Sequence, residues 1–314
     1  RRVLFRSAST VSSRGVYKFP VEDKKSAIYD DHQCSSYDVE ACSWSNIPDE
    51  DFALADDYHW TIGQFVWTGF DYLGEPSPYD TNAWPNHSSM FGIIDLASLP
   101  KDRYYLYRSI WNKEAETLHI LPHWTWPGRE GEVTPVFVYT NYPAAELFIN
   151  GKSYGKQSKN NSSLKSRYRL MWMDAVYEPG EVKVVAYDKD GKAVAEKVVR
   201  TAGKPHHIEL VSNRNELTAD GKDLAYVTVK VVDKDGNLCP ADNRLINFSV
   251  KGAGTYRAGA NGDPTSLDLF HLPKMHAFNG MLTAIVQTNE TAGEIILTAK
   301  AGGVKAGSIR LLTK

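Results

Sequence analysis

The sequence is poor in several features that would assign it to a class of proteins. Its 314 residues contain three cysteines, too few for a disulfide framework. No apolar run approaches the roughly 20 residues of a membrane-spanning helix, and residues 1–10 lack the apolar centre of a secretory signal. The formal net charge of −2 gives no basis for attraction to nucleic acid or to an anionic membrane. We therefore expect neither of these as a partner.

Neither the cysteines nor the histidines form a recognisable ligand motif. Cys34 and Cys42 are close enough in sequence to pair, but spacing alone does not decide this, and we expect two free thiols. His119 and His123 have the i, i+4 spacing of a helical metal site, whereas Pro122 and the surrounding strand pattern argue against a helix. The sequence predicts no metal site and no cofactor.

Aromatic residues are abundant, with 8 Trp and 17 Tyr. Most of the Trp residues lie between Trp44 and Trp126. Aromatic side chains bury large areas, so core packing is the simpler role for them. The alternative is a carbohydrate site, in which the flat apolar faces of sugar rings stack on indole rings.

Residues 8–115 combine helix and strand signals. Acidic residues 49–51 precede apolar residues at helical spacing, which predicts a helix that begins there. A strand over residues 64–68 follows, and residues 100–111 predict a second helix with Pro100 near its first turn. The order helix, strand, long loop, helix is typical of the end of a βα-repeat fold.

From residue 118 onward only strand signals occur. Short runs rich in β-branched and aromatic residues, together with Asn-Gly and Asp-Gly turns at Asn150 and Asp190, predict a small antiparallel β-sandwich over residues 118–202. A linker follows, and residues 206–314 predict a second, immunoglobulin-like sandwich. Its expected strands are residues 224–232, 246–250, 281–286 and 294–299.

The segment GQFVWTGFDYLGEP, residues 63–76, is the most informative part of the sequence. It is an apolar strand that ends in aromatic residues and runs directly into a polar loop rich in Gly and Pro. A (β/α)8 barrel builds one wall of a sugar site from such a strand, because its active site lies at the carboxyl ends of the strands. Trp67 would lie at that end.

Several motifs together carry a family resemblance that spans residues 8–314. SSRGVY (residues 12–17), residues 63–76, SMFGIID (89–95) and residues 100–111 resemble the end of the barrel of a family 2 glycoside hydrolase of the β-galactosidase type found in gut bacteria. LHILPHWTW (118–126), FINGK (148–152) and RLMW (169–172) resemble the β-sandwich that follows this barrel. Residues 223–232, 259–264 and 277–280 resemble the C-terminal immunoglobulin-like domain. The resemblance implies a mixed fold, the C-terminal remnant of a (β/α)8 barrel followed by two all-β immunoglobulin-like sandwiches.

The resemblance also implies a retaining hydrolase with two glutamates about 5 Å apart, one a nucleophile and one an acid/base. The region that carries the acid/base in the family has no counterpart here. Ala8, Ser9 and Thr10 match the tail of the nucleophile motif, which puts Arg6 at the position of the glutamate. We therefore expect no catalytic residue in this chain, because both glutamates lie upstream of Ala8. The chain alone should be inactive, whereas the full-length protein would be periplasmic or secreted, would act on a carbohydrate (a β-galactoside) and could form an oligomer.

Residues 1–7 suggest an origin outside the gene. RVLFRS, residues 2–7, is the translation of CGT GTG CTC TTC CGA TCT, the end of a common sequencing-adapter oligonucleotide. Our hypothesis is that this segment is adapter sequence in a metagenomic assembly. An intact genomic locus that encodes the same residues would contradict it.

The resemblance gives Trp67 the role of stacking beneath the sugar, with barrel-core packing as the alternative. Asp71 and Glu75 are too close together in one loop to form a replacement catalytic pair. Asp71 is expected either to orient the loop or to bind sugar hydroxyls, or else to be a solvated acid. Trp84 and His87, in the long loop after the strand, are candidates for lining the substrate cleft, and for His87 an ordinary loop histidine is the favoured alternative.

Two other classes of function stay open. The sandwiches could be carbohydrate-binding modules, with Trp124, Trp126, Tyr139 and Trp172 as an exposed aromatic row, although we favour core packing for these residues. They could also be structural spacers. The strand that carries Trp67 is expected to have no parallel neighbour, so residues 8–113 should be less ordered than the sandwiches or rest on them.

Overall fold

The computed structural model describes residues 3–8, 10–25 and 28–314. The chain divides into two compact units, one formed by Arg1–Asp95 and Pro100–Thr201 and the other by Leu96–Leu99 and Ala202–Lys314. Within the described residues, no helix has the length and apolar character needed to cross a membrane. Part of the proposed adapter segment, residues 1 and 2, and Ser9 of the nucleophile tail lie outside the described residues.

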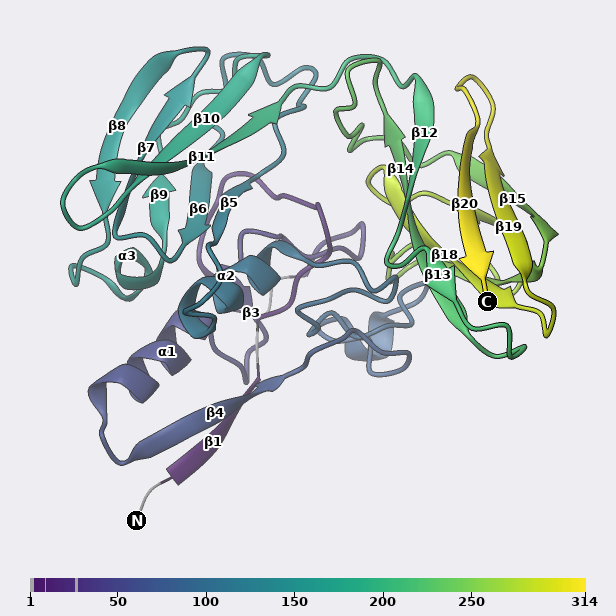
Figure 1. The fold of residues 1–314 in the computed structure, drawn as a ribbon. Coiled ribbons are helices and arrows are strands. Elements are labelled where there is room, and N and C mark those ends of the chain that lie inside the picture. The colour runs from purple at the N-terminus through teal and green to yellow at the C-terminus, as the bar shows by residue number, and fades with distance from the viewer. Residues whose placement is uncertain (1–2, 9, 26–27) are drawn as a thin grey trace. The chain divides into compact units, whose positions relative to one another are not determined.

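The first unit begins with two parallel strands, β1 (Val3–Ala8) and β4 (Thr61–Trp67), which lie side by side in Figure 1. Their register pairs Arg6 with Phe65 and Ala8 with Trp67. The expectation that the Trp67 strand has no parallel neighbour is therefore wrong. Parallel strands need a long crossover, commonly with a helix, and the chain between β1 and β4 supplies one.

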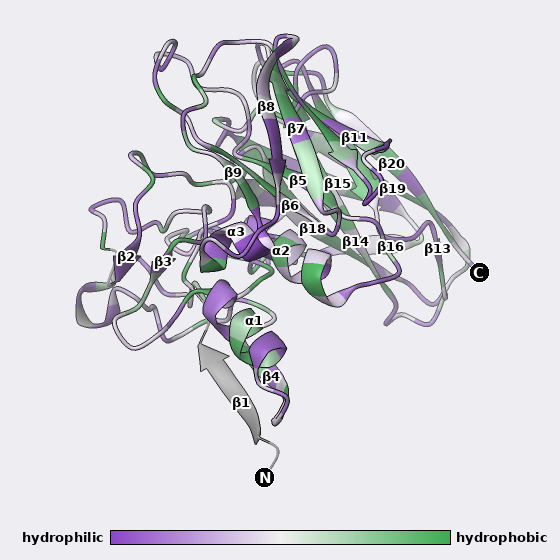
Figure 2. Cartoon of the chain, turned by 90° about the vertical axis from the view of Figure 1, so that its left-hand side faces the viewer, coloured by the Kyte–Doolittle hydropathy of each residue, from purple (hydrophilic) through white to green (hydrophobic). Residues whose placement is uncertain are grey.

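That crossover contains α1 (Pro48–Asp57), and α2 (Asp102–Trp111) follows β4. Both predicted helices are confirmed. Asp49, Glu50 and Asp51 occupy the first turn of α1, where the helix dipole favours negative charge. Figure 2 shows hydrophobic and hydrophilic residues along α1, and its buried Phe52 packs with Leu106 and Tyr107 of α2. The short elements between β1 and α2 are β2 (Lys24–Lys25), β3 (Glu40–Ala41) and the 3-10 helix η1 (Asp80–Asn82).

A β-sandwich completes the first unit. One sheet has the order β5-β6-β9 and the other the order β11-β10-β7-β8. Trp124, Tyr139 and Trp172 are almost fully buried, so they pack in the interior and form no exposed aromatic row. The sequence missed α3 (Leu164–Tyr168), a single turn started by a capping box at Ser163. The strands are β5 (Leu118–Leu121), β6 (Val136–Thr140), β7 (Ala144–Ile149), β8 (Lys152–Ser158), β9 (Leu170–Trp172), β10 (Glu181–Tyr187) and β11 (Ala193–Arg200).

The residues that precede this sandwich rest on it through buried contacts. The Arg169 guanidinium, fully buried, forms an ion pair with Asp49 at the start of α1. The same guanidinium and the Tyr139 hydroxyl both donate hydrogen bonds to the Tyr37 carbonyl, each at 3.3 Å. The Tyr37 hydroxyl in turn donates to the Pro135 carbonyl at 2.6 Å. The expectation that this segment rests on a sandwich is confirmed.

The second unit is a separate β-sandwich with sheet orders β12-β14-β18-β16 and β13-β20-β19-β15-β17. Alternate residues of β14, from Ala225 to Val231, are fully buried, which is the pattern of a strand with one face in the core. All four strands expected from the sequence are present. The strands are β12 (His207–Ser212), β13 (Glu216–Leu217), β14 (Leu224–Val232), β15 (Leu245–Gly252), β16 (Gly254–Ala260), β17 (Lys274–His276), β18 (Met281–Thr288), β19 (Gly293–Lys300) and β20 (Gly307–Thr313).

Candidate functional site

The carboxyl ends of β1 and β4 bring two loop segments together. Residues 10–14 follow β1, and residues 68–95 follow β4. The Ser12 amide donates to the Met90 carbonyl at 3.1 Å, and the Thr68 amide donates to the Phe91 carbonyl at 3.4 Å. The stretch around residues 90–91 thus touches both strand ends. The site region predicted from the Trp67 strand is a compact, hydrogen-bonded set of loops.

Lys101, the residue that precedes α2, links these loops through its buried side chain. Its side chain is 1% exposed. The ammonium lies 2.6 Å from the Asp71 carboxylate and donates to the carbonyls of Ser12 at 2.7 Å and Met90 at 3.3 Å. Burial lowers the pKa of this ammonium, and the Asp71 carboxylate opposes that effect. One cation therefore connects the segment after β1 with both sides of the long loop after β4.

Asp71 orients the loop rather than facing solvent. One carboxylate oxygen accepts the Gly92 amide at 2.7 Å, and the other meets Lys101. Burial raises the pKa of this carboxyl to about 6, although the Lys101 ammonium lowers it. Of the roles expected for Asp71, solvated acid is contradicted and loop orientation is supported by these contacts.

Two further buried ion pairs secure the same segments. The Arg103 side chain on α2 lies 2.9 Å from Asp38 and donates to the carbonyl groups of Thr10 and Phe91. Burial raises the pKa of Asp38, and Arg103 lowers it. Arg14 pairs with Asp95 at 2.5 Å with both side chains buried.

Trp67 and Tyr72 form the edge of a small apolar cluster. The indole N–H of Trp67 donates to the Tyr72 hydroxyl at 3.1 Å, and that hydroxyl donates to the Glu75 carboxylate. The two aromatic side chains pack against a buried group that comprises Val11, Cys34, Cys42, Tyr79, Ala83, Met90 and Phe91. The Trp67 side chain is partly exposed, and its indole N–H is engaged by Tyr72.

The other two predicted residues occupy the outer part of the long loop. Trp84 is 73% exposed. His87 is half-buried; its Nδ1 lies 3.1 Å from the Pro85 carbonyl, and its own carbonyl accepts the Gly74 amide at 2.8 Å. The structure thus joins Trp67 and Asp71 to one loop network and puts Trp84 at its surface. A sugar contact by Trp67, Asp71, Trp84 or His87 stays a prediction.

The thiols belong to the buried apolar cluster against which Trp67 and Tyr72 pack. Cys34 and Cys42 are buried and unpaired with each other, as expected. Burial raises the pKa of both thiols, that of Cys42 to about 12. Among the described residues, no group of His, Cys, Asp and Glu is arranged to hold a metal ion.

Sequence reasoning missed Lys101 and Gly92. A Cβ atom on Gly92 would lie 2.2 Å from the Asp71 amide nitrogen and 2.4 Å from the Ile94 carbonyl oxygen. Only glycine fits this close approach of two backbones. The signal available in the sequence was a glycine between apolar residues after a strand, a pattern that ordinary turns and bulges share.

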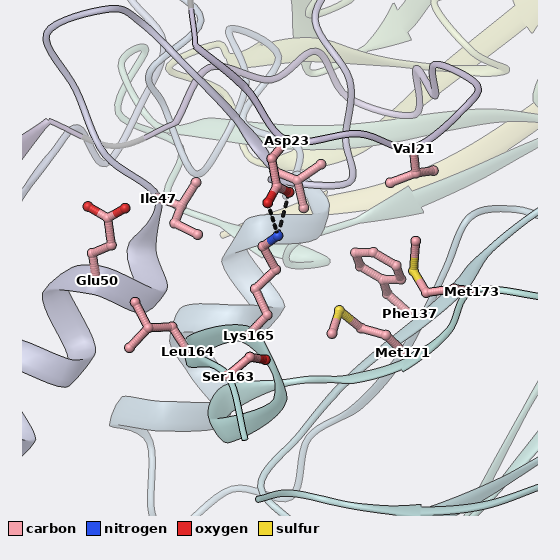
Figure 3. Close-up of a pocket in the computed structure, with 11 residues that line it drawn as sticks. Val21, Asp23, Ile47, Glu50, Phe137, Ser163, Leu164, Lys165, Met171 and Met173 are labelled. Atoms are coloured by element: carbon pink, nitrogen blue, oxygen red, sulfur yellow. Dashed lines mark hydrogen bonds and ion pairs between the residues drawn. The ribbon is translucent and has the colours of Figure 1, made fainter. Parts of the chain in front are cut away.

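A separate cavity of about 500 Å³ lies elsewhere in the first unit, between residues of α1, α3 and β9. Figure 3 shows the ion pair between Lys165 and Asp23 in the middle of the lining, with Phe137, Met171 and Met173 on one side of it and Ile47, Glu50 and Leu164 on the other. Its lining is largely aliphatic and sulfur-containing. None of the four predicted site residues lines it.

Comparison with known families gives two matches along the chain. Residues 208–310 match the glycoside hydrolase family 2 C-terminal domain 5. Residues 131–195 match a domain of unknown function, DUF4982. The matched ranges fall in the second unit and in the sandwich of the first unit, respectively.

Relatives extend the likeness over almost all of the chain. A β-galactosidase of Bacteroides ovatus, BoGH2A, is 41% identical over 98% of this chain, which covers 36% of that protein. A β-glucuronidase of Formosa agariphila is 26% identical over 83% of the chain, covering 26% of its length. The crystal structure of a β-glycosidase from Bacteroides vulgatus superposes with a TM-score of 0.84 and 29% identity, covering 98% of this chain and 41% of that one. The chain thus spans about a third of the length of these curated relatives.

Proposed function

The chain carries C-terminal domains of glycoside hydrolase family 2, and we propose that it is the C-terminal part of a retaining β-galactosidase-type hydrolase that acts on O-glycosidic bonds of carbohydrates. The observation that carries this proposal is the parallel pairing of Ala8, the first residue beyond the proposed adapter segment, with Trp67 at the end of β4. Ala8 is level with Trp67, so the strand that would bear the nucleophile lies beside the strand that would bear the sugar platform. We further propose that β1, β4, α1 and α2 are the end of a (β/α)8 barrel.

The proposed chemistry divides between this chain and upstream residues. Retaining hydrolysis uses two carboxyl groups about 5–5.5 Å apart, one as nucleophile and the other as acid and then base. Position 6, where the family resemblance expects the nucleophile, is Arg, and an arginine cannot attack an anomeric carbon. Removing both carboxylates removes covalent catalysis and proton transfer, each worth orders of magnitude in rate. We therefore propose that this chain is inactive by itself.

The site residues that this chain does contain would bind the sugar and keep the surrounding loops in position. The ring face of Trp67 would stack against the apolar face of the sugar, with its edge fixed by Tyr72. The ion pair of Lys101 with Asp71 would keep the loop after β4 at a constant distance from the segment after β1. Such preorganisation matters because small errors in the position of a bound sugar reduce the rate strongly.

The proposal can be tested with two proteins. This chain and a chain extended upstream to include the missing barrel are assayed on aryl β-galactoside, aryl β-glucuronide and aryl β-mannoside. We expect turnover of the galactoside by the extended chain only. Turnover by the 314-residue chain would refute the claim of inactivity. A preference of the extended chain for the glucuronide or mannoside would refute the galactosidase type.

For the first sandwich, a structural role is the alternative that the contacts favour over glycan binding. Its large aromatic residues Trp124, Tyr139 and Trp172 are buried. Arg169 and Tyr139 instead hold Tyr37 and Asp49, which belong to the preceding segment. Retention of the chain with Trp67 replaced by Ala on a galactan column would contradict this choice, because binding would then arise outside the proposed subsite.

A further inference from the structure

Trp44 is a large aromatic residue next to the proposed subsite, and no role has been assigned to it so far. Its side chain is 57% exposed. One part of the ring rests on Phe91, with ring centroids 5.5 Å apart and planes inclined by 57°. Phe91 is itself fully buried. Trp44 is therefore supported from beneath while much of its surface stays open.

The position of Phe91 relates Trp44 to Trp67. The Phe91 carbonyl accepts the amide of Thr68, the residue after Trp67, and it also accepts a hydrogen bond from the buried Arg103. Phe91 belongs to the apolar cluster on which Trp67 packs. Phe91 thus contacts Trp44 through its ring and the residue after Trp67 through its backbone carbonyl.

Trp44 has the properties of a second surface, beside Trp67, on which a ring of the ligand could stack. An indole with open surface offers a flat apolar area at low conformational cost, and ligand sites combine such surfaces with a few polar groups. A six-membered ring joined to the first sugar would extend away from Trp67 and require support of this kind. A pyranose and an aryl group both present such a ring.

We propose that Trp44 is a specificity-determining residue that contacts the ring following the first sugar, so that the site favours β-galactosides with a ring-bearing aglycone over free galactose. This inference rests on the proposed function, because it takes Trp67 as the first subsite. It commits to a saccharide or aryl ring as the occupant of the Trp44 surface.

The test uses the 314-residue chain labelled with 5-fluorotryptophan and followed by ¹⁹F NMR, with signals assigned through single Trp-to-Phe variants. The ligands are galactose, a β-linked galactosyl disaccharide and an aryl β-galactoside. We expect galactose to shift the Trp67 signal only, and the other two ligands to shift Trp67 and Trp44. The disaccharide and aryl arms then show which ring the Trp44 surface prefers.

A binding comparison gives the magnitude. We expect W44A to weaken binding of the two-ring ligands about two- to tenfold, the range for one aromatic contact, and to leave galactose binding unchanged. W60A is the matched control, because Trp60 is 41% exposed but precedes β4 at its opposite end. Unchanged signals of the buried Trp124 and Trp172 show that each variant is folded.

The outcomes separate the two proposals. If Trp67 responds to every ligand and Trp44 to none, the inference about Trp44 is refuted while the proposed function stands. A Trp44 response to galactose alone would also refute it, because no second ring is then involved. If no ligand shifts Trp67 at concentrations up to tens of millimolar, the first subsite is refuted and the inference fails with it.

Discussion

Replacing Lys101 by Met removes the ammonium that three acceptors share while keeping a side chain of similar length. The Asp71 carboxylate, 2.6 Å from the ammonium in the wild type, stays buried without its counter-ion, and the carbonyl groups of Ser12 and Met90 lose a donor. Breaking one side of a buried ion pair typically costs about 3–5 kcal/mol. We expect a loss of this size in the free energy of unfolding of the first unit near pH 8.

The loss of stability in K101M should depend on pH, because the protonation of Asp71 changes with pH. Burial raises the pKa of its carboxyl from 3.8 to about 6. An acid whose pKa is raised by folding contributes stability below its unfolded pKa and loses that contribution as pH rises through its folded pKa. At 1.36 kcal/mol per pH unit, the difference between 3.8 and 6 amounts to about 3 kcal/mol. Without Lys101 the pKa of Asp71 rises further. The part of the K101M penalty that comes from Asp71 is therefore small below pH 5 and grows above pH 6, while the lost hydrogen bonds to the Ser12 and Met90 carbonyls cost the same at every pH.

The measurement is urea unfolding of wild type and K101M at pH 5, 6.5 and 8, with amide exchange of residues 68–75 and 86–94 to locate the effect. The control is K18M. Lys18 pairs with Asp31 at 2.5 Å, but that carboxylate is 54% exposed, and such a pair is worth at most about 1 kcal/mol. A K101M penalty that is equal at pH 5 and pH 8, or no larger than that of K18M, would refute the reasoning.

Two further predictions concern the packing around the site. R169M should destabilise the first unit by about 3–5 kcal/mol, because Asp49 then stays buried without its counter-ion. The control R310M should change the stability by less than about 1 kcal/mol, because Arg310 is 76% exposed. Thermal unfolding monitored by circular dichroism measures both effects, and equal effects would contradict the prediction. Cys34 and Cys42 should resist alkylation at pH 8 until the protein unfolds, since burial raises the pKa of both thiols; modification of the native chain within minutes, detected by mass spectrometry, would be the opposite result.

The strands were predictable because their pattern is local. Alternating apolar residues over 224–232 place β14 correctly at both ends. The acidic first turn of α1 and the apolar residues that follow it were sufficient for that helix. In each case the interactions that decide the structure lie within a few residues of one another, so the sequence displays them directly.

The buried ion pair between Asp71 and Lys101 could not be predicted in the same way. Asp71 and Lys101 are far apart in sequence, and their pairing depends on how the loop after β4 folds back toward α2. The neighbour of β4 was also missed, because β1 is formed by residues that carry no convincing strand pattern and pair only through the parallel crossover. Single-sequence reasoning sees the composition of a loop but not the contact that gives a buried acid its partner.

The position of the site loops depends on the sandwich that follows them in sequence. Asp38 accepts hydrogen bonds from Thr10 and from Arg103 and so fixes the segment after β1. The residue before it, Tyr37, is held by its carbonyl, which accepts hydrogen bonds from Arg169 and Tyr139 of the sandwich.

A displacement of the sandwich would therefore move Tyr37 and Asp38 and, through them, the strand end on which the proposed nucleophile would stand. These contacts are buried and charged, so they tolerate little displacement without exposing an unpaired ion. The sandwich is in this sense part of the support of the loops after β1 and β4, although its large aromatic residues Trp124, Tyr139 and Trp172 are buried in its interior.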